Sequence, residues 1–233
     1  MSLSVQAPAP RSWGAQIKDK IRRRYEQIAE TGFDGQIGSA GYSQSFLDGL
    51  PKPVLDSYCG CGNPLAGEDL SDARVVINLG CGAGMDSRLA ATLLPSGGLV
   101  VGVDLAPAML RHADGDAVAA DMENLPLANG IADLVLANAS LNLAVDKAAA
   151  LGEAFRVLRA GGRLLARDLI RQGELPLELM EDPLAWNTSL GGVLEENELR
   201  DAIHAAGFVD VRISGHRPFA PVVSVKLDAK KPS

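Results

Sequence analysis

Histidine, cysteine and aromatic residues are scarce in this chain of 233 residues, which holds three histidines, three cysteines and 4% phenylalanine, tyrosine and tryptophan combined. An odd and low cysteine count excludes the disulfide framework of small secreted proteins. Long hydrophobic runs are also missing, since none approaches the roughly 18 residues that a membrane span requires. Residues 1–12 lack the charged start and apolar core of a signal peptide. These absences predict a cytoplasmic protein that does not enter the membrane.

Basic residues are also fewer than acidic ones. The chain has 22 lysines and arginines and 29 aspartates and glutamates, which gives a net charge of −7 and a pI near 5.0. A nucleic-acid partner would require a basic surface to meet its phosphates, so none is expected. The histidines show no metal-ligand spacing and the carboxylates are scattered, so no metal site is expected. With 47% hydrophobic residues, the composition fits one globular α/β domain. We expect a small-molecule substrate and a monomer or homodimer.

A glycine-rich turn between two apolar runs is the most informative stretch of the chain. The run 75–77 leads into Gly80-Cys81-Gly82-Ala83-Gly84, a helix-like segment follows, and a second apolar run closes on Asp104. Strand, tight turn, helix and strand with an acid at its end form a βαβ nucleotide-binding half. Glycines let a ligand approach the backbone, and the start of the helix offers free N–H donors. The acid can accept both hydroxyls of a ribose, so the stretch predicts a nucleoside site.

The spacing of these glycines separates two classes of nucleotide. The dinucleotide fingerprint GxGxxG would need its third glycine at position 85, which is Met85, so a nicotinamide-dependent oxidoreductase is disfavoured. The spacing GxGxG resembles motif I of the class I S-adenosylmethionine-dependent methyltransferases. That resemblance implies a methyltransferase with S-adenosylmethionine as its cofactor. It also implies an α/β fold with a doubly wound, seven-stranded, Rossmann-like sheet, here preceded by an N-terminal helical lid.

The same resemblance implies which residues contact the cofactor. Asp121 and Met122 match the acid and the apolar neighbour that such enzymes place against the adenine, and Asn138 ends the fourth strand. One departure is that the acid usual two residues before the first glycine is Asn78, which offers hydrogen bonds but no charge. The complete expected set is Asn78, Gly80, Cys81, Gly82, Gly84, Asp104, Leu105, Asp121, Met122 and Asn138.

Amphipathic and turn patterns predict the other elements. A lid helix is expected from Trp13 to about Glu30, and its apolar face would hold Ile17, Ile21, Tyr25 and Ile28. Ser43 is expected to cap a short helix that Pro51 stops. The expected later strands are 117–121, 133–138, 163–169 (after a turn at Ala160-Gly161-Gly162), 209–213 and 222–227, and later helices begin at Pro107, Asp146 and Glu195. We expect residues 1–68 to form a tail, lid helices and cysteine loop, and residues 69–233 to form one compact cofactor-binding core.

A narrower resemblance covers nearly the whole chain after residue 15. The segments that resemble the arsenite methyltransferases are Arg24-Tyr25, Tyr42-Ser43, Gly60-Cys61-Gly62-Asn63-Pro64, Asn138-Ala139-Ser140-Leu141-Asn142-Leu143, Asp146-Lys147, Asp182-Pro183, Trp186 and Gly191-Gly192-Val193-Leu194. In that family, cysteine thiolates gather trivalent arsenic, a soft centre for which soft ligands are suited. The lone pair of the arsenic then attacks the sulfonium methyl group.

The cysteines that this family uses are only partly present. The upstream cysteine matches Cys61, whereas the one after the fourth strand falls on Ala139. The third falls on Ser189, or on Thr188 if the alignment slips by one residue. Because two of three metalloid ligands are absent, we expect methyl transfer to a small-molecule acceptor other than arsenite. Two alternatives stay open: an arsenite methyltransferase that uses Cys61 and Cys59, and a metalloid-binding protein without turnover.

Residues around the cysteine loop would shape the acceptor pocket. The expected substrate-binding residues are Tyr25, Tyr58, Cys59, Cys61, Trp186, Thr188 and Ser189. Cys61 and Ser189 are the candidate catalytic residues. A thiolate, amine or enolate acceptor needs little acid–base help, since proximity and alignment supply most of the rate. A hydroxyl acceptor would need a base, and the three histidines fall where adenosine-side or surface positions are expected.

Overall fold

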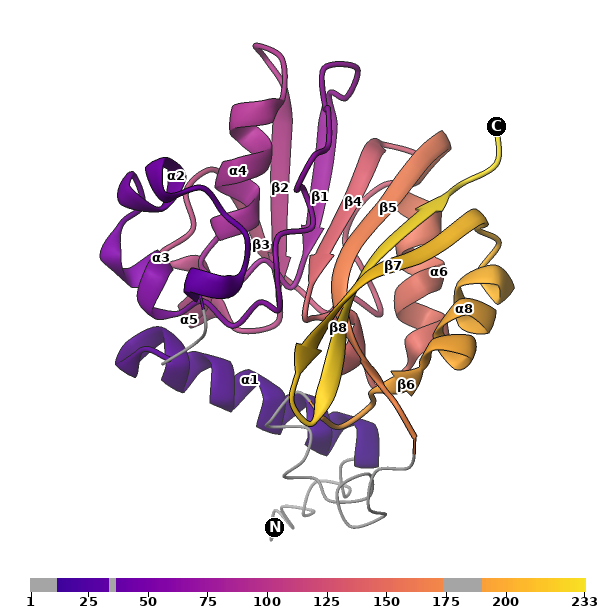
Figure 1. Ribbon diagram of the computed structural model, residues 1–233, viewed down its shortest axis with the longest axis horizontal. Helices are drawn as coiled ribbons and strands as arrows, with labels where there is room; N and C mark the ends of the chain where they lie inside the picture. Colours follow the sequence, from indigo (N-terminus) through magenta and orange to yellow (C-terminus); the bar gives the residue numbers. More distant parts are fainter. Residues whose placement is uncertain (1–11, 34–36, 174–189) are drawn as a thin grey trace, which may run out of the picture.

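A mixed eight-stranded sheet forms the centre of the computed structural model, which describes residues 12–33, 37–173 and 190–233 (Figure 1). Its strands are β1 (Val75–Leu79), β2 (Leu99–Asp104), β3 (Asp116–Ala119), β4 (Ala132–Asn138), β5 (Leu158–Arg171), β6 (Leu194–Glu195), β7 (Val209–Phe219) and β8 (Val222–Lys230). The main path runs β3-β2-β1-β4-β5-β8-β7, and the short β6 pairs with β5. The expected seven-stranded, doubly wound sheet is confirmed, with β6 as an addition.

The middle of the sheet is parallel and its far edge is antiparallel. β1 pairs in parallel with β2 and β4, whereas β8 pairs antiparallel with β5 and β7. Val76, Ile77 and Leu79 explain the central place of β1, because all three are fully buried and a strand covered on both faces needs apolar side chains throughout. The parallel strands end at one edge of the sheet, which is where open α/β folds bind their ligands.

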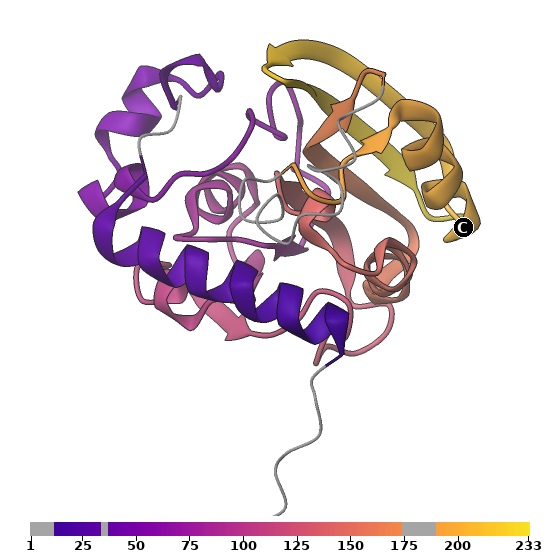
Figure 2. The ribbon, with the colours of Figure 1, turned by 90° about the horizontal axis from the view of Figure 1, so that it is seen from below.

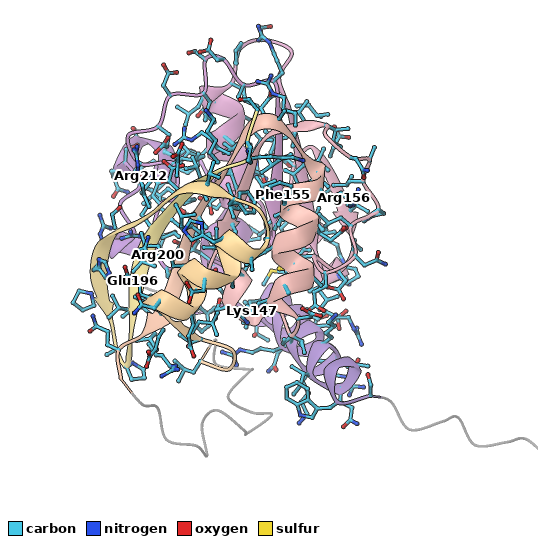
Figure 3. All side chains as sticks on the ribbon, turned by 90° about the vertical axis from the view of Figure 1, so that its right-hand side faces the viewer. Lys147, Phe155, Arg156, Glu196, Arg200 and Arg212 are labelled. Carbon is cyan, nitrogen blue, oxygen red and sulfur yellow. The ribbon has the colours of Figure 1, made fainter. Side chains whose placement is uncertain are left out.

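Helices cover both faces of the sheet. α6 (Lys147–Val157) and α8 (Glu196–Ala205) lie side by side on one face, as Figure 3 shows, and their apolar residues join the largest hydrophobic core. α4 (Met85–Leu93) covers the other face, where Ala90 is fully buried against β1, β4 and β5. With both faces occupied, only the ends of the strands are left for a ligand.

The longest helix lies over the carboxyl edge of the sheet. α1 (Trp13–Thr31) crosses this edge, and the view from below in Figure 2 shows it in front of the strand ends. Ser12 caps the helix by accepting a hydrogen bond from a backbone N–H of its first turn at 3.3 Å. The expected apolar face is confirmed, since Ile17, Ile21 and Ile28 are buried against the segments that follow β2 and β4. The hydrophobic contact therefore holds α1 across the strand ends.

Short elements complete this edge. They are η1 (Ile37–Ser39), α2 (Gln44–Asp48), α3 (Lys52–Asp56), α5 (Pro107–Leu110) and η2 (Leu141–Leu143). Ser43 caps α2 as expected, by accepting a hydrogen bond from the backbone N–H of Phe46 at 3.3 Å. α3 was not expected, because Pro51 suggests a stop. Proline is tolerated at the start of a helix, where its missing N–H would have no partner, and here it precedes a new helical turn.

Three strands are longer than their sequence patterns predict. β5 begins at Leu158 and runs through the glycine pair that was expected to form a turn, with a shift in its register against β4 between Ala132 and Leu134. Gly161 takes a φ of +75° in this irregular stretch, so the glycines form an irregularity within the strand rather than its boundary. β7 continues to Phe219 as the exposed edge strand, which pairs through its backbone without needing regular hydrophobic alternation. β8 continues to Lys230 between β5 and β7, where Val225 and Leu227 are fully buried.

Among the described helices, none is both long and apolar enough to cross a bilayer. The boundary expected near residue 68 stays a prediction.

Candidate functional site

A cleft opens at the carboxyl edge of the sheet, beneath α1. It encloses about 990 Å³ of empty space, including its open mouth. The cleft brings together most of the residues that the sequence singled out. Those on its wall are Gly80, Cys81, Gly82, Asp104, Leu105, Asp121, Met122 and Asn138 from the expected cofactor set, and Tyr25, Tyr58 and Cys59 from the expected substrate set.

The glycine turn forms the floor of this cleft. Gly80 takes a φ of +65°, and a Cβ atom there would lie 2.4 Å from the Cβ atom of Ser140, so no larger residue fits. Ser140 is itself held by a hydrogen bond from its Oγ to the carbonyl of Leu79 at 2.8 Å. Gly82 also has a positive φ, but a Cβ atom there would meet nothing within 4 Å. The backbone at Gly82 therefore faces open space in the cleft.

Asp104 closes the turn from the neighbouring strand. Its Oδ2 accepts a hydrogen bond from the backbone N–H of Gly82 at 2.8 Å, and its Oδ1 accepts one from Ala106 at 2.8 Å. Burial raises the pKa of this carboxyl group, and the two backbone donors oppose that shift. Each oxygen keeps further lone-pair capacity toward the cleft. The acid thus braces the turn and can still accept hydrogen bonds from a ligand.

A cluster of charges bridges α1 to the other end of the cleft. The Lys18 ammonium of α1 lies 2.7 Å from Oδ2 of Asp121 and also pairs with Glu123. The second oxygen of Glu123 accepts backbone hydrogen bonds from Val145 and Asp146 at 2.7 and 3.0 Å. Glu123 therefore links three segments of the cleft rim, and the lid helix is tied to it by charge as well as by its apolar face.

A buried polar network that was not predicted lies on the opposite wall. Asp86, in the first turn of α4, accepts hydrogen bonds from Tyr42 Oη at 2.7 Å and from Asn138 Nδ2 at 2.8 Å. Burial raises the pKa of Asp86 to about 6. An acid in the first turn of a helix is usually explained by the helix dipole, which is why the pattern alone hides this role. The signal that could have found it is its place directly after the glycine turn.

The two loop cysteines lie in different surroundings. Cys59 is on the cleft wall and packs with Ile28, Ala106 and Met109. Cys61 is buried instead with Ala139 and other apolar residues beyond the cleft wall. Burial raises the pKa of each thiol to about 12, so both are protonated at neutral pH.

Several expected site residues lie off the cleft wall or outside the described residues. Asn78 is buried beneath the turn and donates from Nδ2 to Ser87 Oγ at 3.0 Å. Gly84 is the N-cap of α4, with a φ of +85°. Trp186, Thr188 and Ser189 lie outside the described residues. Within residues 12–33, 37–173 and 190–233, no three histidine, cysteine, aspartate or glutamate side chains gather as a metal site would require.

Comparison with known proteins supports the same fold and shows the family. A family profile described as a methyltransferase domain matches residues 70–207. The chain is 32% identical over 229 residues to an arsenite methyltransferase of Aquipseudomonas alcaligenes, covering 88% of this chain and 65% of that protein. It is 29% identical over 231 residues to an arsenite methyltransferase of Halobacterium salinarum, covering 85% of this chain and 59% of that protein.

A crystal structure shows the same similarity. An arsenic(III) S-adenosylmethionine methyltransferase from Chlamydomonas reinhardtii superposes with a TM-score of 0.71 at 26% identity, covering 81% of this chain and 72% of that one. The chain spans about 59 to 65% of the length of the two arsenite methyltransferases that it matches in sequence.

Proposed function

Because the chain belongs to the class I S-adenosylmethionine-dependent methyltransferase family, we propose that it transfers the methyl group of S-adenosylmethionine to a small-molecule acceptor other than arsenite. The observation that carries this proposal is that residue 139 is an alanine and not a cysteine. This residue lies in the same buried cluster as Cys61, at the position where the arsenite methyltransferases carry a second thiol. When bound, S-adenosylmethionine supplies an electrophilic methyl group on a positively charged sulfonium.

The cleft fits this cofactor. The Gly80–Gly84 turn exposes backbone where a Cβ atom would block a close approach, and Asp104 has acceptor capacity for the hydroxyls of a ribose. Asp121 and Met122 lie at the other end of the cleft, where an acid can accept from an adenine amino group and a thioether can pack on the ring. These residues would hold the nucleoside.

Asp86 supplies the negative charge that Asn78 lacks. The family pattern places an acid in the strand before the turn, and this chain has an uncharged amide there. Asp86 lies on the cleft wall just after the turn, buried and held by Tyr42 and Asn138. A buried carboxylate with only neutral donors favours a cationic ligand. We assign it to the ammonium group of the methionine portion.

The acceptor would lie between the cysteine loop and α1. Tyr25, Tyr58 and Cys59 face the cleft there, and Trp186, Thr188 and Ser189 complete the proposed pocket from sequence. Cys59 and Cys61 pack in separate clusters, which supports an acceptor other than arsenic. Alignment of a nucleophile with the methyl group supplies the rate, and the residues act by positioning.

We further propose a cytoplasmic protein that acts as a monomer or homodimer. The net charge of −7 argues against a nucleic-acid partner. Three free cysteines are suited to a reducing compartment.

The affinity for S-adenosylmethionine should fall at acidic pH, because Asp86 becomes protonated. A raised pKa means that the carboxyl group loses its charge at a higher pH than usual, so attraction to an ammonium is present above pH 6 and is lost as the pH falls through that value. With a pKa of about 6, the ionised fraction drops about tenfold between pH 7 and pH 5, and the dissociation constant should rise by a similar factor. Calorimetric titration with S-adenosylmethionine across this range measures it.

The matched control is Asp86→Asn, which keeps the shape of the side chain and removes its charge. This variant should bind weakly at pH 7 and show a flat profile between pH 5 and pH 7. A slope that persists in Asp86→Asn would assign the titration to another acid, such as Asp104.

Product analysis with a labelled methyl donor tests the function itself. Arsenite should be offered beside a panel of thiol, amine, phenol and carboxylate acceptors, with S-adenosylhomocysteine release as a common readout. We expect label in at least one organic acceptor and none in arsenic. Methylated arsenic at enzymatic rates would establish the first alternative. Arsenic binding without any labelled product, lost on mutation of both loop cysteines to serine, would establish a metalloid-binding protein instead.

A further inference from the structure

One arginine in the interior carries a charge that nothing around it balances. Arg167, on β5, is only 4% exposed. Its Nε is buried without a hydrogen-bond partner, and among the described residues no carboxylate pairs with its guanidinium. A buried, unpaired charge destabilises the fold unless a partner compensates it. The position therefore calls for an anion from outside the described chain.

Neighbouring cations on the same face of the sheet have carboxylate partners, so the lack of a counter-ion is local to Arg167. Arg163, four residues earlier on β5, lies 3.0 Å from Asp228 and 3.1 Å from Glu68. Lys226, the register partner of Arg167 on β8, lies 2.7 Å from Glu68. Two acidic groups are electrostatic neighbours of Arg167, namely the Cys61 thiol and the Tyr58 phenol. Burial raises the pKa of both, so neither carries a balancing negative charge at neutral pH.

A second arginine, which also lacks a partner among the described residues, is an electrostatic neighbour of Arg167. Arg217 of β7 is exposed, and after burial its positive charge is the next cause that lowers the pKa of Arg167. It forms no ion pair with any described carboxylate. Two guanidinium groups held close without a counter-ion repel each other, and an oxyanion bound to both would convert that repulsion into attraction.

Glycine backbone packs directly against the two guanidinium groups. A Cβ atom at Gly62 would lie 2.6 Å from Nε of Arg167, and one at Gly215 would lie 3.1 Å from its Nη1. A Cβ atom at Gly41 would lie 3.3 Å from Nη1 of Arg217. Three separate segments thus pack bare backbone against the arginines, and a side chain at these positions would crowd a guanidinium group.

The arginine pair is next to the cleft. Asn138, on the cleft wall, is the register partner of Arg167 on the adjacent strand. Its Nδ2 donates to the carbonyl of Gly62 at 2.7 Å, and the other side of Gly62 touches Arg167. One loop residue therefore separates the guanidinium from the cleft wall. A ligand that reaches over this loop could place one group in the cleft and an anionic group at the arginines.

We propose that Arg167 and Arg217, bordered by Gly41, Gly62 and Gly215, bind the carboxylate or phosphate of the methyl acceptor. This assignment rests on the proposed methyltransferase function, and it narrows the acceptor to small molecules that carry an anionic group. The two arginines act by binding and positioning the acceptor, with no step of the chemistry assigned to them.

Titration with inorganic phosphate at constant ionic strength tests the anion site. Charge-assisted, bidentate hydrogen bonds to arginine support a loss of about tenfold or more in phosphate affinity for Arg217→Ala and for Arg167→Met. Arg217 is exposed, so its variant tests the site even if the buried Arg167→Met fails to fold. Arg212→Ala, on the same strand (Figure 3), is the matched control and should bind phosphate as the unmodified protein does. Phosphate binding that is absent, or indifferent to Arg217, would overturn the proposal.

A pair of thiols that differ only in charge tests the link to the acceptor. The probes are 3-mercaptopropionate and 3-mercapto-1-propanol, and their binding is measured by calorimetry with S-adenosylhomocysteine present. We expect the anionic thiol to bind about tenfold more tightly or better, with the preference lost in Arg217→Ala. Equal binding of the two thiols, with phosphate binding still dependent on arginine, would make this a site for a free anion and overturn the acceptor assignment.

The binding measurements separate this proposal from the proposed function. If the charge preference holds but no acceptor ever receives a labelled methyl group, methyl transfer fails and the anion site stands. If methyl transfer occurs equally to charged and neutral acceptors, the function stands and the anion site fails.

Discussion

Replacing Asp104 with alanine should weaken S-adenosylmethionine binding by about a hundredfold or more. A hydrogen bond to a charged acceptor contributes about 1.5–3 kcal/mol, and the proposed contact with both ribose hydroxyls involves two of them. The variant also orphans the backbone N–H groups of Gly82 and Ala106, which now donate to the carboxylate at 2.8 Å. The turn that forms the floor of the cleft would lose its brace, so both contributions act in the same direction. Equilibrium dialysis with labelled cofactor measures the change.

Two controls separate these contributions. Asp104→Asn keeps the shape and one acceptor oxygen, so its loss should be intermediate. Asp116→Ala removes an exposed acid from the neighbouring strand β3 and should leave affinity unchanged. Binding within threefold of the original in a folded Asp104→Ala protein would contradict the proposed ribose contact.

The second large effect is a gain of arsenic binding. Ala139→Cys places a thiol in the cluster that already holds Cys61, and Ser189→Cys supplies the third position of the family pattern. Trivalent arsenic gains affinity steeply with each further thiolate of a chelate, because the later bonds form within one molecule. We expect the double variant to bind arsenite at least about a hundredfold more tightly than the original chain.

Fluorescence or mass spectrometry of arsenite complexes measures this gain. Ala144→Cys is the matched control, since Ala144 is also a buried alanine, 4% exposed, on the cleft wall. That variant adds a thiol outside the family pattern and should gain little. Ala139 has a φ of +51°, which costs a β-carbon residue some strain already present in the original chain, so the substitution adds none from the backbone. Arsenite binding by the unmodified chain as tight as that of the double variant would refute the importance of the missing cysteines.

Much of the cofactor cleft was predictable because its residues are close in sequence. The glycine turn and Asp104 fall within a single βαβ unit, and local spacing specifies such a unit almost completely. The family resemblance inferred from that spacing is confirmed by the relatives and by the methyltransferase profile. The apolar stripe of α1 was equally clear, because apolar residues at a helical period within a charged segment are typical of an amphipathic helix.

The polar network and the arginine pair were not predictable in the same way. Asp86 and Tyr42 lie 44 positions apart and meet through hydrogen bonds, and no local pattern joins them. Arg167 sits in a strand that also holds the paired Arg163, so only the folded neighbourhood shows that one of the two lacks a counter-ion. The sequence shows which residues are arginines, whereas only the tertiary structure shows which of them has a carboxylate partner.

The contacts of α1 also determine when the ligand site can form. This helix precedes its packing partners in the chain, since Ile17 and Ile21 pack with Leu105, Leu143 and Val145. Its salt bridges reach forward by more than a hundred positions to Asp121 and Glu123. During synthesis the apolar face of this helix therefore stays uncovered until about residue 145 has been added. The helix over the cleft is thus made before the segments it covers, and its apolar face is exposed on the nascent chain until they follow.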